Sequence, residues 1–264
     1  MKTRILSGVL MLPLLIFVVL GGIPLAIACF IIGVMGIREF FNCFKAADIK
    51  ASEGIAVASA AMLYTVYLTV PNGKELNDYI MPWLFLSVAA SMLYLFKFNE
   101  RKLEDALVTI IGIVYIVFFP LHVSLTEQSG EYGILVWLIF LTAFGTDIMA
   151  YFTGYAIGKH KLAPNISPKK TIEGSIGGVV GSIVLCGIFG YFVVPEILVH
   201  CLVIGAIGGI ISQLGDLTAS IFKRKLGVKD YGNLIPGHGG ILDRFDSVLF
   251  TAPMVYYYIT LVLM

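Results

Sequence analysis

Long apolar segments separated by short polar ones run through the chain, and this pattern predicts an all-α protein that crosses a membrane many times. A spanning helix needs about 20 mostly apolar residues. About nine segments approach or exceed that length: residues 5–20, 23–44, 55–70, 80–97, 104–125, 133–157, 174–194, 197–222 and 243–264. Only Gly21 and Gly22 separate the first two segments, so these predict a tight helical hairpin.

The composition supports a polytopic integral membrane protein. Of the 264 residues, 58% are hydrophobic and 13% are charged, whereas soluble domains carry roughly 25% charged residues. The net charge is +1, from 18 basic and 17 acidic residues. Such a balance excludes the strongly basic surface that nucleic-acid binding requires, so no nucleic-acid partner is expected.

The lysines and arginines predict the orientation. If the N-terminus is cytoplasmic, every one of the 18 basic residues except Lys74 falls on the inner side, as the positive-inside rule requires. The two longest inner connections are residues 158–173 and 223–240. We therefore expect a multi-pass protein of the cell (inner) membrane whose site faces the cytoplasm. We expect residues 1–103 to form an N-terminal transmembrane region, and residues 104–264 to form a C-terminal transmembrane region that carries this site.

Four acids stand out because ionisable residues inside membrane spans are costly and usually functional. Asp147 and Asp216 lie within predicted spans, and Asp243 and Asp246 open the last one. A spacing of three residues would place Asp243 and Asp246 on one helical face. A buried ion pair remains an alternative for Asp147, and a favourable charge at a helix N-terminus remains one for Asp243.

Carboxylates that converge from two adjacent helices predict a site for a hard cation. Asp216, Asp243 and Asp246 would supply the oxygen ligands that Mg²⁺ prefers. Zinc fits poorly, because no cysteine and only one histidine is nearby. Gln213 and Ser220 share a face of the eighth span with Asp216.

Basic and glycine-rich positions beside these acids predict phosphate binding. The basic residues are Lys169, Lys170, Lys223, Arg224 and Lys229. In PGHGG, Gly237, Gly239 and Gly240 would let backbone N–H groups approach an anion closely, at the start of a helix. Ordinary cytoplasmic loop charge and a simple turn explain the same residues singly. His238 has three open roles: ligand, base or hydrogen-bond donor.

Several catalytic motifs are absent from the sequence. It contains no GxxxxGK[ST] phosphate loop, no HExxH and no GxSxG. The DDxxD pattern of membrane prenyl transferases and the DGxxAR…GxxxDxxxD pattern of CDP-alcohol phosphotransferases are also missing. These enzyme classes are therefore not expected.

One segment resembles a known family signature. Residues Ser220–Asp246, SIFKRKLGVKDYGNLIPGHGGILDRFD, are similar to the pattern S-x-x-K-R-x4-K-D-x-G-x2-[apolar]-P-G-H-G-G-[apolar]-x-D-R-F-D of phosphatidate cytidylyltransferases, also called CDP-diacylglycerol synthases. Every defined position matches. The segments SPKKTIEGSIGG, FGTD and QLGDLTAS also resemble the family, so the likeness covers at least residues 144–247.

The resemblance implies the reaction of CTP with phosphatidate to give CDP-diacylglycerol and pyrophosphate, with dependence on Mg²⁺. It also implies a homodimer with a membrane-embedded cavity open to lipid. Two other functions use similar parts: a CTP-dependent lipid kinase and, less favoured, a secondary transporter of a phosphorylated solute. Transporters usually show repeated halves and sites at the membrane midplane, whereas these halves differ and the acids cluster towards one face.

The site residues follow from these arguments. Asp216, Asp243 and Asp246 are expected to hold one or two cations and, with Lys229 and His238, to form the catalytic set. The expected phosphate-binding residues are Lys169, Lys170, Lys223, Arg224, Gly237, Gly239, Gly240 and Arg244. Asp147, Ser220 and Asp230 are secondary candidates. We expect His238 to position a phosphate rather than to act as a base, because a phosphate monoester is largely ionised at neutral pH.

Overall fold

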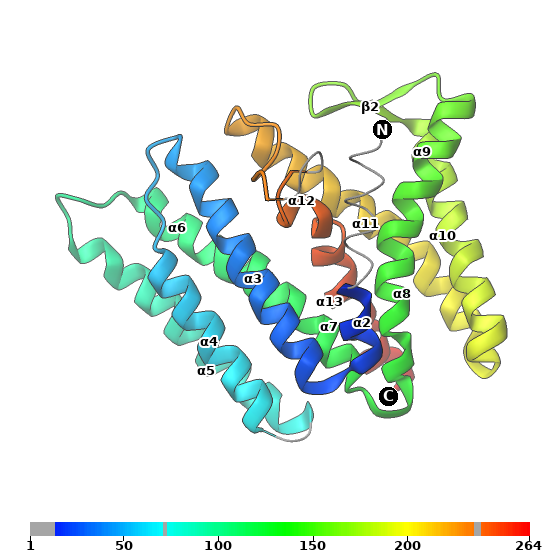
Figure 1. The fold of residues 1–264 in the computed structure, drawn as a ribbon, viewed down its shortest axis with the longest axis horizontal. Helices are drawn as coiled ribbons and strands as arrows, with labels where there is room; N and C mark the ends of the chain where they lie inside the picture. The colour runs from blue at the N-terminus through cyan, green and yellow to red at the C-terminus, as the bar shows by residue number, and fades with distance from the viewer. Residues whose placement is uncertain (1–13, 71–72, 235–238) are drawn as a thin grey trace. The chain divides into compact units, whose positions relative to one another are not determined.

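The computed structural model describes residues 14–70, 73–234 and 239–264. Helices make up most of this part of the chain, together with one two-stranded sheet (Figure 1). The prediction of an all-α membrane protein is confirmed. The chain divides into two compact units. Where described, unit 1 comprises Met1–Ser129 and Lys225–Arg244, and unit 2 comprises Gly130–Arg224 and Phe245–Met264.

Six described helical segments are long and apolar enough to cross a membrane. They are Gly22–Lys45, Asp78–Phe96, Leu103–Glu127, Gly130–Ile157, Ile172–Val193 and Pro195–Lys225. Glu53–Thr69 and Val248–Leu263 are shorter apolar helices. Every predicted segment from residue 23 onward overlaps one of these eight. The count of nine spans and the side of the N-terminus stay predictions.

Unit 1 begins with the predicted hairpin of helices. α2 (Leu14–Leu20) and α3 (Gly22–Lys45) meet at Gly21 and Gly22, whose φ angles are 61° and 50°. Residues with side chains rarely adopt such angles, so glycine allows this reversal. The N–H group of Gly22 donates to Glu127 Oε2 at 3.0 Å, which satisfies one of the unpaired donors at the start of α3.

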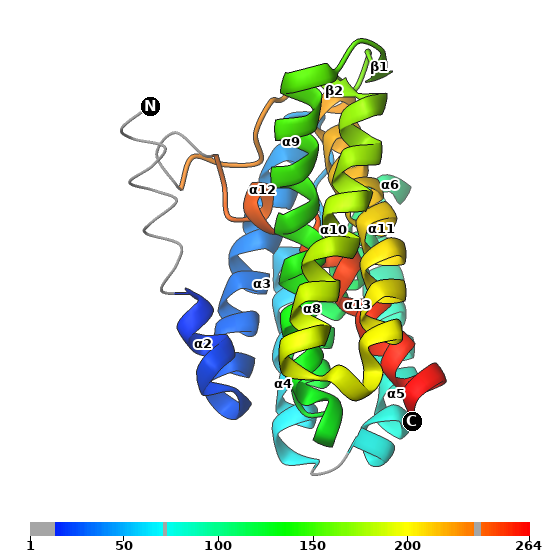
Figure 2. The same ribbon diagram turned by 90° about the vertical axis from the view of Figure 1, so that its right-hand side faces the viewer.

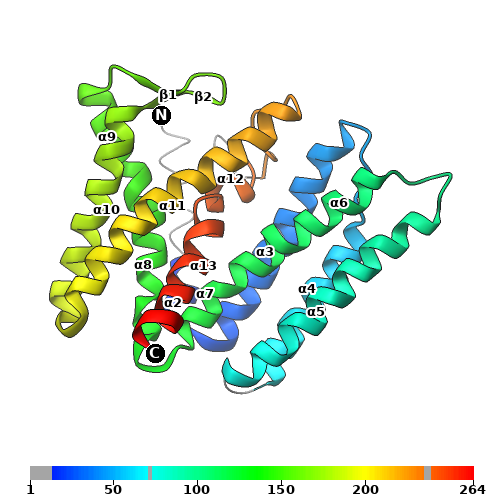
Figure 3. The same cartoon turned by 180° about the vertical axis from the view of Figure 1, so that it is seen from behind.

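The remaining helices of unit 1 pack side by side against α3 or against one another (Figures 1 and 3). α4 (Glu53–Thr69) and α5 (Gly73–Leu93) are followed by a 3₁₀ turn, η1 (Tyr94–Phe96). The next span combines α6 (Leu103–Gly112), a π-helical segment η2 (Ile113–Phe118) and α7 (Phe119–Glu127). Pro120 lacks an N–H group, and the local change of helical pitch lies just before it.

Unit 2 contains the helices that carry most of the candidate residues. A 3₁₀ segment η3 (Gly130–Leu135), α8 (Val136–Phe140), a π-helical segment η4 (Leu141–Gly145) and α9 (Thr146–Ile157) form one span. α10 (Ile172–Val193), the 3₁₀ turn η5 (Pro195–Ile197) and α11 (Leu198–Lys225) follow. Figure 2 shows α9, α10 and α11 running alongside one another.

Glycines bring α10 close to α9. A Cβ atom added to Gly174 would lie 2.8 Å from the Ala150 carbonyl oxygen, and one added to Gly178 would lie 3.0 Å from the Ala150 Cβ. Gly177 and Gly181 likewise face α9, against Thr153 and Met149. Gly174 with Gly178 and Gly177 with Gly181 form two overlapping GxxxG pairs, and both therefore serve helix packing.

Two features differ from the sequence-based expectation. The connection at residues 158–173 contains an antiparallel hairpin of β1 (Lys161–Ala163) and β2 (Ser167–Thr171), where only a loop was expected. The last predicted span is interrupted, because α12 (Leu242–Phe245) ends two residues before α13 (Val248–Tyr258) begins. The π-helical segment η6 (Ile259–Leu263) then continues α13. Asp243 and Asp246 therefore do not share a face of one continuous helix, because Asp246 lies in the turn.

Candidate functional site

The hairpin places two candidate lysines next to the start of α10. Lys169 and Lys170 are neighbours on β2, so their side chains leave opposite faces of the strand. The hydroxyl of Thr171, the next residue, accepts the N–H of Gly174 at 3.1 Å and caps α10. This cap ties the strand to the helix. Lys170 forms an ion pair with Asp216 Oδ2, while Lys169 is exposed.

α11 carries Asp216 towards this hairpin. Ser220, one turn further along, donates from Oγ to Asp216 Oδ1 at 3.4 Å. Gln213 Nε2 donates to the Ser175 carbonyl oxygen at 3.2 Å and so faces α10. The shared face of Gln213, Asp216 and Ser220 that the spacing predicts is thus present, with each of them engaged by a polar partner.

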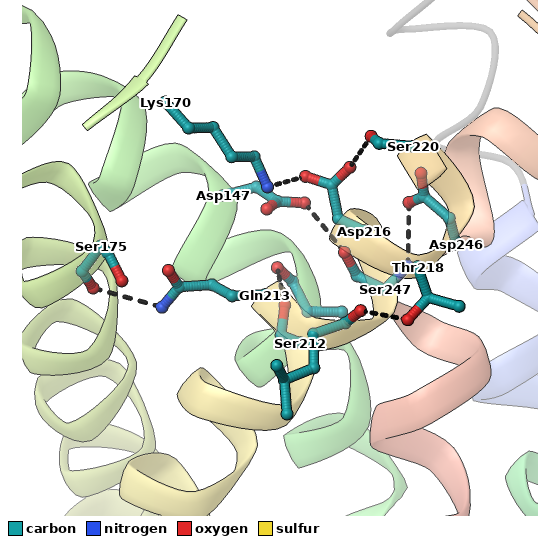
Figure 4. Close-up of polar contacts among 12 residues, drawn as sticks. Asp147, Lys170, Ser175, Ser212, Gln213, Asp216, Thr218, Ser220, Asp246 and Ser247 are labelled. Atoms are coloured by element: carbon teal, nitrogen blue, oxygen red, sulfur yellow. Dashed lines mark hydrogen bonds and ion pairs between the residues drawn. The ribbon is translucent and has the colours of Figure 1, made fainter. Parts of the chain in front are cut away.

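Three carboxylates gather in unit 2, and Figure 4 shows them together. Asp147, Asp216 and Asp246, which we call the acid cluster, come from α9, α11 and the turn before α13. Asp246 Oδ1 accepts the N–H of Ser247 at 2.8 Å. The hydroxyl of Ser247 donates to Asp147 Oδ2 at 3.3 Å. Asp246 is buried; the charges of Asp216 and Asp147 repel it and that of Lys223 attracts it.

A pocket of about 610 Å³ opens beside part of the acid cluster, entirely within unit 2. Its polar lining comes from five elements of the chain: α9, β1, β2, α10 and α11. These residues include Asp147, Lys161, Ser167, Lys169, Lys170, Thr171, Ser175, Gln213 and Asp216. A cavity lined by two acids and three lysines can take a phosphate-bearing ligand together with a cation.

The other candidate residues belong to unit 1, except for two on α11. Asp243 is buried, and its Oδ2 accepts the N–H groups of Tyr231 at 2.8 Å and Gly240 at 2.9 Å. Gly239 has a φ of 84°, which favours glycine, and a Cβ there would lie 2.8 Å from Asp243 Oδ2. We call residues 239–243 the signature turn. Asp243 therefore helps to fix its backbone.

The other basic candidates differ in exposure. Lys229 and Asp230 are exposed, and Arg244 is half-buried. On α11, Lys223 is buried, and Arg224 Nε donates to the Ile166 carbonyl oxygen of the hairpin at 3.1 Å. Gly237 and His238 lie outside the described residues, so their predicted roles stay predictions.

Comparison with known proteins places this chain in a family. Residues 2–262 match the model of the cytidylyltransferase family. The chain belongs to this family. It is 35% identical to a phosphatidate cytidylyltransferase of Synechocystis sp., over 98% of this chain and 97% of the relative. Enzymes of the same name from Bacillus subtilis (33% identity; 99% and 98% covered) and Staphylococcus saprophyticus (34% identity; 97% of each covered) are also similar. The resemblance predicted from the signature is confirmed.

The acid cluster of this cytidylyltransferase family member has the donor chemistry that Mg²⁺ requires. Its ligands would be carboxylate oxygens, and a cation would relieve the repulsion that Asp216 and Asp147 exert on the buried Asp246. Among the residues described, no three His, Cys, Asp or Glu side chains lie close enough together to bind a metal ion as they stand. The ammonium group of Lys170 is bound to Asp216 instead.

Sequence reasoning did not single out Ser247 or Ser175. Ser247 bridges Asp246 and Asp147 through its N–H and hydroxyl groups, and Ser175 binds Gln213. Ser247 directly follows the last acid of the family signature, and Ser175 lies within the family-like segment SPKKTIEGSIGG. These positions in or beside the family segments were the available signal for both residues.

Proposed function

We propose that this chain transfers the cytidylyl group of CTP to phosphatidate, giving CDP-diacylglycerol and pyrophosphate. The observation that carries the proposal is the pocket of unit 2, in which Lys170 and Asp216 form an ion pair. The family match over residues 2–262 supports the same reaction. Lysines and carboxylates facing one cavity suit a reaction in which one phosphate group attacks another.

The reaction forms one phosphorus–oxygen bond and breaks another. A phosphate oxygen of phosphatidate attacks the α-phosphorus of CTP, and the bond from that phosphorus to the bridging oxygen of the β-phosphate breaks, so pyrophosphate leaves. A phosphate monoester has its second pKa near 6, so the nucleophile needs no general base at neutral pH. The obstacle is repulsion between two anions, and positioned positive charge is what lowers it.

The basic residues supply this charge in the proposal. Lys170 would release Asp216 and bind a phosphate of CTP, which its flexible side chain allows. The expected phosphate-binding residues besides Lys170 are Lys169, Lys223, Arg224, Lys229 and Arg244. Backbone N–H groups at Gly237, Gly239 and Gly240 are proposed to bind a phosphate oxygen, and His238 to donate a hydrogen bond to one.

Mg²⁺ is the proposed cofactor, held by Asp216, Asp243 and Asp246, and a second cation is compatible with the number of acids. Asp147 and Ser220 are supporting candidates because each contacts a member of this set or its neighbour. When bound, the cation would neutralise charge on the phosphates of CTP. Asp230 stays a secondary candidate on the family signature alone.

The proposal extends to location and assembly. The protein would lie in the cell membrane with its site facing the cytoplasm, where CTP is made, as the distribution of lysines and arginines predicts. The lipid substrate would enter from the bilayer. A homodimer is proposed from the family resemblance.

A direct assay tests the proposal. The purified protein is incubated with phosphatidate, CTP labelled at the α-phosphate, and Mg²⁺, and the lipid and soluble products are identified. Labelled CDP-lipid with released pyrophosphate supports the proposal, whereas a phosphorylated lipid with CDP would indicate a lipid kinase. In sealed membrane vesicles without detergent, added CTP should be consumed only by inside-out vesicles, and the opposite result would reverse the proposed orientation.

A further inference from the structure

Glu39 of α3 binds the signature turn, although some 200 residues separate them in the sequence. Its Oε1 accepts the N–H of Ile241 and its Oε2 accepts the N–H of Leu242, each at 2.9 Å. Both partners are buried. Hydrogen bonds to a charged acceptor are about twice as strong as neutral ones, so a single carboxylate fixes two successive backbone groups.

The chain around Glu39 is shaped to admit this carboxylate. A Cβ atom at Gly232 would lie 2.7 Å from Glu39 Oε1, and one at Gly240 would overlap Glu39 Oε2. Neither glycine has a positive φ, so at these two positions close approach explains the absence of a side chain better than backbone conformation does.

Next to Glu39, α3 also contacts Tyr231, which precedes the signature turn in the sequence. The rings of Phe40 and Tyr231 have centroids 5.9 Å apart, and Cys43 Sγ donates to the Tyr231 carbonyl oxygen at 3.3 Å. Cys43 lies one helical turn after both Glu39 and Phe40, at spacings of four and three residues. The contact is therefore a continuous docking surface, with Glu39 as its charged member.

We propose that Glu39 is a positioning residue for catalysis: it fixes the turn that presents Asp243. Its two partners directly precede Asp243, whose own Oδ2 binds the N–H groups of Gly240 and Tyr231. Two carboxylates, at positions 39 and 243, thus satisfy four backbone N–H groups of one short region. This inference rests on the proposed function, in which Asp243 binds the cation, and Glu39 acts on that acid as an outer support.

Hydrogen–deuterium exchange tests the anchor without substrate or metal. Glu39→Gln keeps the shape of the side chain but offers one acceptor oxygen in place of two. The amides of Ile241 and Leu242 should then exchange about tenfold faster or more than in the wild type. Glu53→Gln is the matched control, because Glu53 binds Arg38, the neighbour of Glu39 on α3, at 2.7 Å. It should leave exchange at these amides unchanged.

Kinetics separate positioning from a general loss of structure. Glu39→Gln should lower kcat about tenfold to a hundredfold and raise the Mg²⁺ concentration for half-maximal activity, with the unfolding temperature near that of the wild type. A merely structural role would lower the unfolding temperature and the active fraction and leave the Mg²⁺ dependence unchanged, and that result would overturn the proposal.

Further outcomes are also decisive. Unchanged exchange in Glu39→Gln overturns the anchor. If that variant does not fold, Gly232→Ala replaces it, since its methyl group would displace the carboxylate, and normal exchange at Ile241 and Leu242 in that variant overturns the proposal. Should the wild type make no CDP-lipid, the proposed function fails, while the exchange experiment still tests the anchor.

Discussion

The acid cluster of unit 2 and the signature turn of unit 1 use carboxylates in different ways. Asp216 and Asp246 bind a lysine ammonium group, a serine hydroxyl and one adjacent N–H. Glu39 and Asp243 bind four backbone N–H groups, of which only that of Gly240 is close in the sequence. A side chain can rotate away from a carboxylate, but a backbone N–H can leave only if the turn unfolds.

This difference separates two tasks that acids would perform at the proposed site. An acid with side-chain partners can exchange them for a cation at little cost to the fold. An acid with backbone partners fixes the conformation of the chain. Any carboxylate oxygen that it presents to a ligand therefore has a fixed position. In the proposed function Asp243 would do both, because its Oδ2 accepts the two N–H groups and the same carboxylate is a proposed ligand of the cation.

The largest effect is expected from Asp246→Asn. Loss of one negative charge should weaken cation binding and lower kcat about a thousandfold or more. The fold should persist, since an asparagine oxygen can still accept the N–H of Ser247. The assay follows labelled CDP-lipid, with Asp78→Asn on the exposed surface of α5 as control. Activity within tenfold of the wild type at ordinary Mg²⁺ would remove Asp246 from the cation site.

Two substitutions of Asp243 should divide its tasks. Asp243→Asn keeps an oxygen for Tyr231 and Gly240 but loses the charge, so turnover should fall about a hundredfold at a near-normal unfolding temperature. Asp243→Ala leaves both buried N–H groups unpaired and should also lower the unfolding temperature by about 5 °C. Equal unfolding temperatures for the two variants would contradict the holding role.

The sequence predicts local features of this molecule well. Gly21 and Gly22 mark the helix reversal because glycine is the residue that adopts positive φ cheaply. Gln213, Asp216 and Ser220 share a face because helical periodicity is regular over a long span. The hairpin at 161–171 was not predicted, because KLAPNISPKKT lacks the apolar alternation of a strand.

Long-range partners were beyond the same reasoning. Glu39 lies inside the predicted span 23–44, and an acid in a span is itself a functional signal. Its place near the polar end of that span, beside Arg38, resembles ordinary boundary charge. Its contact with Ile241 depends on tertiary packing that no local pattern encodes. The expected helical face of Asp243 and Asp246 was wrong because the chain turns at Asp246 and Ser247.

A smaller effect is expected at the hairpin, where two adjacent lysines differ in placement. Both lysines line the pocket, but Lys170 is half-buried and binds Asp216, whereas Lys169 is exposed. Lys170→Met should raise the KM for CTP about tenfold, because a partly buried cation attracts phosphate more strongly than an exposed one. Lys169→Met should change it less than about threefold. Equal changes in both variants would show that the strand contributes only general positive charge.

The smallest effect is expected at an exposed ion pair, which gives a baseline for the pair of Lys170 and Asp216. Lys102 Nζ lies 2.5 Å from Asp48 Oδ2, and their side chains are 57% and 68% exposed. The hydrogen bond from Lys102, with the charges of Lys102 and Lys50, lowers the pKa of Asp48. Solvent and salt screen such pairs strongly. Asp48→Asn is the suitable change, since the φ of 55° at this position is one that asparagine tolerates.

Because the folded-state pKa of Asp48 lies below its unfolded value of about 3.9, the pair stabilises the protein above that pH. The contribution is lost as the pH falls through the folded-state value. The unfolding temperature of Asp48→Asn should therefore lie within about 2 °C of the wild type between pH 5 and pH 8. This small difference should shrink further in high salt and in acid. A difference in unfolding temperature larger than about 2 °C that persists in high salt would mean that exposure does not decide how much these ion pairs stabilise the protein. The contrast with Lys170 and Asp216 would then need another cause.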